Sequence, residues 1–210
     1  MFASGAGSNF EALARAAGRG ELGGDIVALL CDQPGAPVIE RAARLGVESL
    51  VLASPRHRTR LDDERPWLDA LRARHVDVLL LAGFMRRLHA TLLEPYANRI
   101  LNIHPSLLPA FPGLDAIGQA LRAGVPATGC TVHMVEPALD SGPILAQAEV
   151  TLRPGESLAA LEARVHEAEH LLYPDTVRRF LTEPWRVEGR WVRFGEGPGL
   201  TAARAGAAHG

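Results

Sequence analysis

The sequence predicts an α/β protein with one open, mostly parallel sheet flanked by helices. Two observations carry this prediction. Short apolar runs alternate with segments of helical periodicity through the first hundred residues, as in consecutive βαβ units. The run VDVLLLAGF at 76–84 is apolar almost throughout, which is typical of a parallel strand covered on both faces. Such units join their strands through right-handed crossovers.

The elements of the first half follow one another at short intervals. A DQPG turn leads into a helix expected at 36–46, which Gly46 closes. In the next expected helix, at 59–75, Leu61, Trp67 and Leu71 share one side. In chain order we expect strands at 25–31, 47–53, 76–84 and 99–104, and helices at 36–46, 59–75 and about 90–97.

The second half is expected to contain one long helix and a terminal hairpin. Ser157 is the predicted N-cap of the long helix, and WRVEGRWVRF reads as a hairpin with a Glu-Gly turn. The expected helices lie at about 115–123 and 157–181, and the strands at 129–135, 143–152 and within 185–194. We therefore expect a main domain at 1–183, a small hairpin at 184–194 and a flexible, Gly- and Ala-rich tail at 195–210.

A glycine-rich turn, SGAGSNF, opens a helix near the start of the chain. Ser8 or Asn9 is the expected cap of that helix. Such a turn normally follows a strand, but only Met1, Phe2 and Ala3 precede it. Either the first strand is a stub, or the true start lies upstream of Met1.

The same turn suits an anion, because backbone N–H groups at a helix N-terminus favour phosphate. It differs from a dinucleotide fingerprint: Phe10 occupies the third glycine position, and no acidic ribose ligand follows the second strand. Phosphate binding without a dinucleotide fits better, and a plain turn remains the alternative.

Composition excludes several classes of function. The chain has 210 residues, 47% of them hydrophobic, and a formal net charge of −2, so no basic excess indicates a nucleic acid or a membrane surface. Cys31 and Cys130 lie far apart within apolar runs, which indicates a reduced compartment rather than a disulfide scaffold. MFASGAGSNF lacks the features of a signal peptide. We therefore expect a cytoplasmic protein.

Asn102 and His104 stand at the end of the strand predicted at 99–104. Residues two apart on a strand point to the same side, so the carboxamide and the imidazole project together. The carboxyl ends of parallel strands are where open α/β sheets bind ligands. An amide can hold a carbonyl oxygen, and an imidazole can exchange a proton near neutral pH. The alternative is a polar strand end that caps a turn.

Asp140 lies before a Ser-Gly-Pro turn, where aspartate is common for structural reasons. If it meets His104 in space, its charge would favour the imidazolium form. His133 is expected to be a strand residue with a satisfied hydrogen bond rather than a catalyst. We expect His57, His75, His89 and His209 at the surface. No Cys/His grouping has zinc spacing, and no Gly-x-Ser-x-Gly elbow is present.

Six segments, in this order and at compatible spacing, resemble one family: SGAGSN, LAGFMRRL, NIHPSLLPAFPG, GCTVH, LDSGPIL and EHLLYP. From Ser4 to about Phe180 the chain is similar to the phosphoribosylglycinamide formyltransferases, folate-dependent enzymes of purine synthesis. NIHPSLLPAFPG with a downstream LDSGPI is specific for folate formyl-transfer domains, and the SGAGSN loop narrows the match to this branch. The resemblance implies a Rossmann-like formyltransferase fold over the domain at 1–183.

The resemblance also implies roles for individual residues. The catalytic trio is Asn102, His104 and Asp140. The residues matched to the ribonucleotide are Gly7, Ser8 and Asn9 for its phosphate and Glu169 for its ribose. The residues matched to folate are Arg60, Met85, Arg86, Arg87, Leu88 and Asn102, with the backbone of 85–88 holding the pterin. Some members carry histidines where this chain has Asp115-Ala116-Ile117, so local substrate contacts there differ.

The implied reaction moves a formyl group from 10-formyltetrahydrofolate, a consumed co-substrate, to the amine of 5-phosphoribosylglycinamide. We expect no metal, no nucleic acid and no membrane partner, and a homodimer is left open. Three alternatives share parts of the pattern. A formyltetrahydrofolate hydrolase usually has an extra N-terminal domain, an initiator-tRNA transferase a basic C-terminal domain, and a non-catalytic folate- or nucleotide-binding module would not need the trio.

Overall fold

The computed structural model describes residues 1–52 and 59–195. Its strands are β1 (Phe2–Ala3), β2 (Ala28–Cys31), β3 (Glu48–Val51), β4 (Leu79–Leu81), β5 (Ile100–His104), β6 (Ala127–Met134), β7 (Ile144–Thr151), β8 (Trp185–Glu188) and β9 (Trp191–Phe194). Its helices are α1 (Ser8–Gly18), α2 (Pro37–Arg44), α3 (Arg65–Arg72), α4 (Ala90–Leu93), α5 (Ala116–Ala123) and α6 (Leu158–Thr182).

The strands form one sheet in the order β3-β2-β1-β4-β5-β6-β7-β9-β8. The first five of these are parallel to one another, as expected for strands joined by helical crossovers. β6 is antiparallel to both β5 and β7, and the β8–β9 hairpin adds to the edge through β9. The predicted fold class is therefore confirmed: a mostly parallel sheet flanked by helices, with a C-terminal hairpin.

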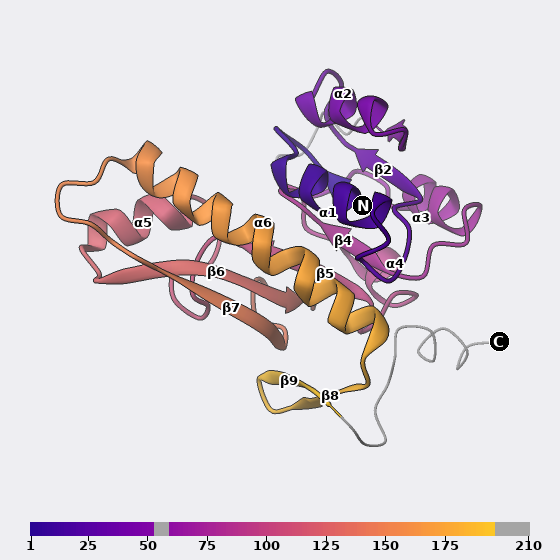
Figure 1. Ribbon diagram of the computed structural model, residues 1–210. Coiled ribbons are helices and arrows are strands. Elements are labelled where there is room, and N and C mark those ends of the chain that lie inside the picture. Colours follow the sequence, from indigo (N-terminus) through magenta and orange to yellow (C-terminus); the bar gives the residue numbers. More distant parts are fainter. Residues whose placement is uncertain (53–58, 196–210) are drawn as a thin grey trace.

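Helices cover both faces of the sheet, and each face has its own apolar core. Residues of α1, α2 and α6 pack on one face, and residues of α3 and α4 pack on the other. On the second face the rings of Phe2, Trp67 and Phe84 have centroids 5.0 to 5.5 Å apart. Figure 1 shows α6 running alongside α1 and across β6 and β7. The cores thus fix α1 and α6 beside the carboxyl end of the parallel strands.

Tyr173 ties α6 to the central strands. Its buried hydroxyl lies 3.1 Å from the carbonyl oxygen of Leu81 and 3.0 Å from that of Leu101, so its hydrogen is shared between neighbouring strands. Burial raises the pKa of Tyr173 well above its ordinary value, which keeps the hydroxyl a donor. The contact is one residue before Asn102, so α6 is anchored next to the predicted site.

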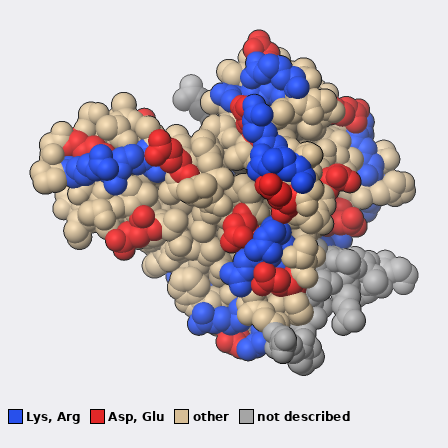
Figure 2. Space-filling view, viewed as in Figure 1, with Lys and Arg blue, Asp and Glu red and all other residues tan. Residues whose placement is uncertain are grey.

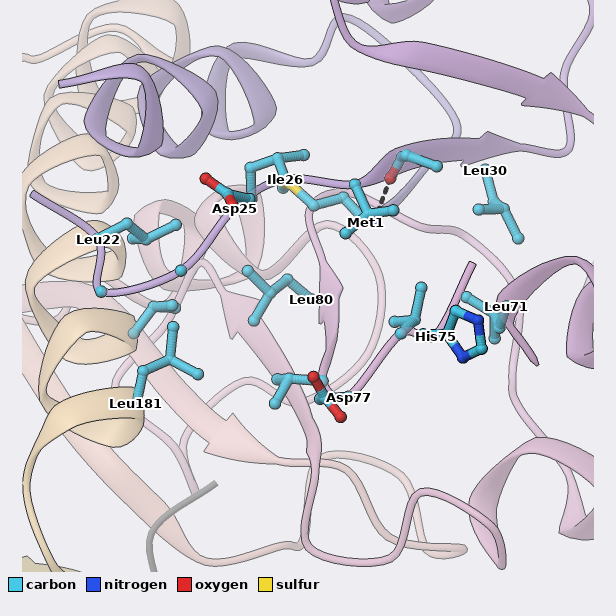
Figure 3. A pocket seen from close by; sticks show the side chains of 17 residues that line it. Met1, Leu22, Asp25, Ile26, Leu30, Leu71, His75, Asp77, Leu80 and Leu181 are labelled. Carbon is cyan, nitrogen blue, oxygen red and sulfur yellow. Dashed lines mark hydrogen bonds between the residues drawn. The ribbon is translucent and has the colours of Figure 1, made fainter. Parts of the chain in front are cut away.

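Strands β2 and β4 begin three residues later than predicted. The strand between them, β1, has only two residues, so 25–27 and 76–78 have no central partner. These segments instead line a cavity of about 350 Å³, seen in Figure 3. The Met1 amine beside it donates to the carbonyl oxygen of Ala28 at 2.7 Å, and burial lowers its pKa to about 5. In the described residues the first strand, β1, consists of Phe2 and Ala3 alone, and which of the two explanations holds for the start stays a prediction.

The helix predicted at 59–75 begins only at Arg65. Pro66 favours a helix start because its fixed φ suits the first turn and its missing N–H would have no intrahelical partner there. Glu64, expected inside that helix, accepts hydrogen bonds from the backbone N–H groups of His89 and Leu92 and so holds the start of α4. Burial raises the pKa of Glu64. A tertiary contact therefore overrides the helical pattern here.

The C-terminal elements match their predictions closely. Ser157 caps α6, accepting a hydrogen bond from the N–H of Ala160 at 3.3 Å. The hairpin joins the sheet where Trp191 pairs with Ile144. The boundaries of the predicted domain division stay a prediction. The tail beyond Gly195, the end of the strand predicted at 47–53, and His57 and His209 lie outside the described residues, whereas His75 and His89 are exposed as predicted.

Candidate active site

Strand β5 places two polar side chains at the carboxyl edge of the parallel strands. Asn102 and His104 lie two residues apart, and Ile103 between them is buried in the core. β4 and β6 flank β5, so both side chains are held in the middle of the sheet. Both line the same cleft, as predicted from their spacing.

The imidazole of His104 is held by the loop that follows β5. Its Nε2 lies 2.9 Å from the carbonyl oxygen of Phe111, and a carbonyl only accepts, so Nε2 carries a hydrogen. Ser106 stabilises the loop by donating to the carbonyl oxygen of Ala110 at 2.6 Å. The proline-rich segment therefore folds back onto the ring and leaves Nδ1 as the nitrogen that can exchange a proton.

Asp140 reaches the site from the loop between β6 and β7. Its Oδ2 lies 3.7 Å from Nδ1 of His104 and accepts a hydrogen bond from the N–H of Gly113 at 2.7 Å. Its Oδ1 lies 3.8 Å from Nε2 of His133. The carboxylate thus sits between two imidazoles and fastens the loop after β5 to the loop after β6. The predicted meeting of Asp140 and His104 is present.

His133 belongs to the same cluster, although the sequence indicated only a strand residue. Its Nδ1 lies 2.8 Å from the carbonyl oxygen of Met134, which confirms the predicted hydrogen bond, and its Nε2 lies 3.1 Å from Nδ2 of Asn102. Burial lowers the pKa of His133, so the ring is neutral, donates through Nδ1 and accepts at Nε2. Asn102 therefore donates to His133, and this bond fixes the direction of its carboxamide.

The position of His133 could not be derived from spacing. His133 pairs directly with Asn102 only because β6 lies antiparallel beside β5. In the sequence, TVHMV has no feature that selects this neighbour or this register. The available signal was weak: a lone histidine in an otherwise apolar strand.

The cluster opens into a cleft of about 580 Å³. A smaller adjoining cavity of about 110 Å³ shares Asn102 and Asp140 with it. Three exposed apolar side chains lie along the cleft: Met85, Leu114 and Leu139. The polar residues are thus gathered in the middle of an elongated site, with apolar surface beside them.

The glycine turn of SGAGSN forms the start of α1. Gly7 is the N-cap, with a φ of 78°, and neither Ser8 nor Asn9 caps the helix through its side chain, so that prediction was wrong. A Cβ at Gly7 would lie 2.4 Å from Cγ2 of Val38, so the turn requires glycine for both conformation and space. The first N–H groups of α1 lie at the positive end of the helix, an environment that favours an anion.

Asn9 instead reaches across to α6. Its Nδ2 donates to Oε2 of Glu169 at 2.7 Å, and the same oxygen lies 2.9 Å from Nδ1 of His166. All three residues line the cleft, and Glu169 is buried. The sequence indicated Asn9 and Glu169 but missed His166, which is in register with Glu169 on one helix face.

Asp32 holds the segment at 85–88, which is predicted to bind the pterin, through hydrogen bonds. Arg86 donates from Nε to Asp32 at 2.7 Å, and Ser4 donates to the same carboxylate at 2.6 Å. The N–H of Met85 donates in turn to Ser4 Oγ. Burial acts to raise the pKa of Asp32, but these hydrogen bonds and one from Gln33 outweigh it and lower the pKa overall. The Arg86 side chain therefore anchors the segment.

The other residues predicted to bind folate lie around the same end of the cleft. Arg87 lines both cavities, and Leu88 is buried in the wall of the smaller one. Arg60 is exposed and forms a β-bridge with Arg87, whose N–H donates to the carbonyl oxygen of Thr59. Thr59, rather than Arg60, lines the larger cleft.

Within 1–52 and 59–195 no three His, Cys, Asp or Glu side chains form a group that could hold a metal ion. The same residues contain no helix long and apolar enough to cross a bilayer. In the view of Figure 2, basic and acidic side chains are intermingled, and no broad basic face is seen.

The fold and the site define a formyl transferase. The formyl transferase family model matches residues 1–177, and the chain belongs to this family.

Two relatives and one solved structure are similar to most of the chain. The chain is 42% identical over 181 residues to the phosphoribosylglycinamide formyltransferase of Bacillus subtilis (strain 168), covering 86% of this chain and 93% of that protein. It is 37% identical over 187 residues to that of Escherichia coli (strain K12), covering 89% and 85%. The crystal structure of glycinamide ribonucleotide transformylase 1 from Symbiobacterium toebii superposes with a TM-score of 0.88, at 39% identity over 93% of this chain and 92% of that one.

Proposed function

We propose that this chain transfers the formyl group of 10-formyltetrahydrofolate to the amine of 5-phosphoribosylglycinamide, a step of purine synthesis, in the cytoplasm. The observation that carries the proposal is the meeting of Asn102, His104 and Asp140 at one cleft. The relatives named above support the choice of substrates.

The reaction needs a donor for a developing negative charge. The substrate amine attacks the formyl carbon, and the former carbonyl oxygen becomes an oxyanion. Asn102 already gives one amide hydrogen to His133, and the other hydrogen would bind this oxygen. A preorganised donor of this kind contributes about two to three decades in rate.

His104 is proposed to stabilise the oxyanion and to move the proton. Because Nε2 is bonded to Phe111, the mobile proton is carried on Nδ1, which faces Asp140. The Asp140 carboxylate lies 3.7 Å from this nitrogen and would orient the ring. The attacking amine loses one proton, and the departing folate nitrogen takes one as the carbon–nitrogen bond breaks. His104 can carry out both transfers without a net change in its own protonation state.

The ribonucleotide is proposed to bind where α1 and α6 meet. The backbone N–H groups at Gly7, Ser8 and Asn9 would hold the phosphate, with support from the helix dipole. Glu169 would accept from the ribose. Asn9 Oδ1 is buried and has no hydrogen-bond partner among the described residues, so a hydroxyl or amide donor of the ligand can use it.

The folate is proposed to enter from the opposite end. The smaller cavity, walled by Leu81, Leu88 and Val135, suits a flat pterin ring, and the backbone of 85–88 would bind its polar edge. Met85 and Leu139 offer apolar surface to the remainder of the molecule. Both ligands would then reach the cluster in the middle, where proximity supplies much of the acceleration.

A formyltetrahydrofolate hydrolase would use the same cluster with water as acceptor. The built site at Asn9 and Glu169 favours the transferase, because a hydrolase has no use for a ribonucleotide pocket. The test is an assay of purified protein with the formyl donor, with and without the ribonucleotide. We expect a formylated ribonucleotide and no formate release in its absence. Formate released at the same rate without ribonucleotide would establish the hydrolase instead.

A further inference from the structure

His166 and Glu169 form a pair whose net charge can change near neutral pH. Nδ1 of His166 lies 2.9 Å from Oε2 of Glu169, so the opposite ring nitrogen, Nε2, is turned away from the carboxylate. The His166 side chain is 48% exposed and lines the cleft, whereas that of Glu169 is 3% exposed. Among the described residues, no hydrogen bond to Nε2 is seen. The ring is therefore held at one nitrogen and available to a ligand at the other.

The groups around His166 favour its charged form. The hydrogen bond with Glu169 raises the pKa of His166 against the opposing effect of burial, and the charges of Glu169 and Glu162 add to the rise. From α1, Asn9 contributes a neutral amide to the same carboxylate. His170, next along α6, has a pKa lowered by burial, so its ring is neutral at pH 7.

Other charged groups near this end of the site are paired or lie across the cleft. Glu11 and Arg41, which act on His170, form an ion pair with each other. Asp115 and Asp140 line the cleft and add negative charge. In the described part of the cleft, the arginines lie at the folate end and His104 lies in the central cluster, so His166 is the titratable group beside Asn9.

We propose that His166 is a pH-sensitive binding residue for the phosphorylated substrate, which it recognises through Nε2 while Glu169 holds the ring. The inference rests on the proposed function. With His166 protonated, the pair is neutral overall and Nε2–H donates to the anionic ligand. With His166 deprotonated, the pair carries a charge of −1 beside that ligand, and the charge-assisted hydrogen bond is lost.

The direction of the effect follows from the raised pKa. The imidazolium form persists at acidic pH and is lost as the pH rises through the raised value. The affinity for the ribonucleotide should therefore fall as the pH increases, and the KM for it should rise. Because His166 is separate from His104 and Asp140, kcat and the KM for the folate should keep the same pH dependence in a His166 variant.

The test is calorimetric titration of the protein with 5-phosphoribosylglycinamide between pH 5.5 and 8.5. Wild type is compared with His166→Gln, which cannot be charged, and His166→Arg, which is always charged. The ligand phosphate itself titrates near pH 6, but it does so in every variant, so ratios of Kd are compared. The Kd of H166Q divided by that of wild type should be about three to ten at pH 5.5, as expected for one partly exposed charge-assisted bond, and should approach one at pH 8.5. H166R should keep its affinity at pH 8.5.

His75→Asn is the matched control. His75 is exposed at the other end of the sheet, and asparagine tolerates its left-handed backbone, so H75N should follow the wild-type profile. A constant ratio of Kd between H166Q and wild type across the range would overturn this inference. If transfer is normal while the ratio stays constant, the proposed function stands and only the inference is lost. If binding shifts as expected but no formyl group is transferred, the inference about His166 stands and the proposed function is lost. If the ribonucleotide does not bind at all, both are overturned.

Discussion

The carboxamide of Asn102 lies 3.1 Å from the imidazole of His133, which faces it from the neighbouring antiparallel strand. The hydrogen bond between the ring and the Met134 carbonyl fixes the tautomer of His133, and the ring in turn fixes the amide. The proposed oxyanion donor would thus be aligned before any ligand arrives. Such alignment matters because a donor that must first be reoriented contributes less to the rate.

Two substitutions at His133 separate this alignment from simple packing. His133→Gln can place an oxygen near the position of Nε2 and still accept from Asn102. His133→Asn is shorter and can keep only the hydrogen bond to the Met134 carbonyl. We expect H133N to lower kcat about five- to tenfold, the value of one hydrogen bond, with H133Q closer to wild type. Steady-state kinetics with both substrates measures this. Equal turnover in H133N and wild type would remove His133 from the account.

Gly7 gives a prediction about stability. Gly7→Ala must adopt a φ of 78° and place its Cβ 2.4 Å from the Val38 side chain, so the first turn of α1 has to shift. We expect a loss of about 2–4 kcal/mol in the free energy of unfolding, from backbone strain plus overpacking. Gly20→Ala is the control, since Gly20 has a φ of 71° but open space around it, and it should lose only about 1 kcal/mol. Urea unfolding that gives equal losses would argue against the close approach to Val38.

Asp32 gives a prediction for the segment at 85–88. Asp32→Asn removes the charge that pairs with Arg86 in a buried site, and we expect a loss of about 3 kcal/mol in urea unfolding at pH 7. Asp63→Asn, in the exposed pair with Arg65, should lose far less, because solvent screens an exposed ion pair.

The pH dependence of that loss follows from the direction of the pKa shift. The pKa of Asp32 in the folded protein lies below its ordinary value of 3.8, so its contribution is fully present above 3.8 and is lost as the pH falls through the lower folded value. The difference between wild type and D32N should therefore be the same at pH 7 and pH 5. A difference that is already halved at pH 5 would contradict the assignment.

The sequence was most informative where local pattern decides structure. Residues close together in the chain were enough to predict three features: the apolar run before Asn102, the cap at Ser157 and the hairpin within 185–194. It failed where a distant partner decides: Glu64 binds α4 and not its own helix, and β2 and β4 are shortened by a neighbouring strand that begins at Phe2.

The candidate site shows the same division. The resemblance placed Asn102, His104 and Asp140, and the fold brings them to one cleft. His133 was missed because it acquires its role from a hydrogen bond to a residue on another strand. His166 was missed although its partner, Glu169, lies only three residues further along the same helix. Spacing alone does not encode which strand lies beside β5, and so does not reveal that His133 faces Asn102.

The central claim is that the amide of Asn102 and the imidazole of His104, stabilised by Asp140, carry the chemistry. The most direct test is the single-turnover rate of formyl transfer to 5-phosphoribosylglycinamide in wild type, Asn102→Ala and Asp140→Ala, with ribonucleotide binding measured in parallel. We expect wild type to transfer the formyl group and each variant to be at least about a hundredfold slower with ribonucleotide affinity retained. Near-normal transfer rates in both variants would contradict the account.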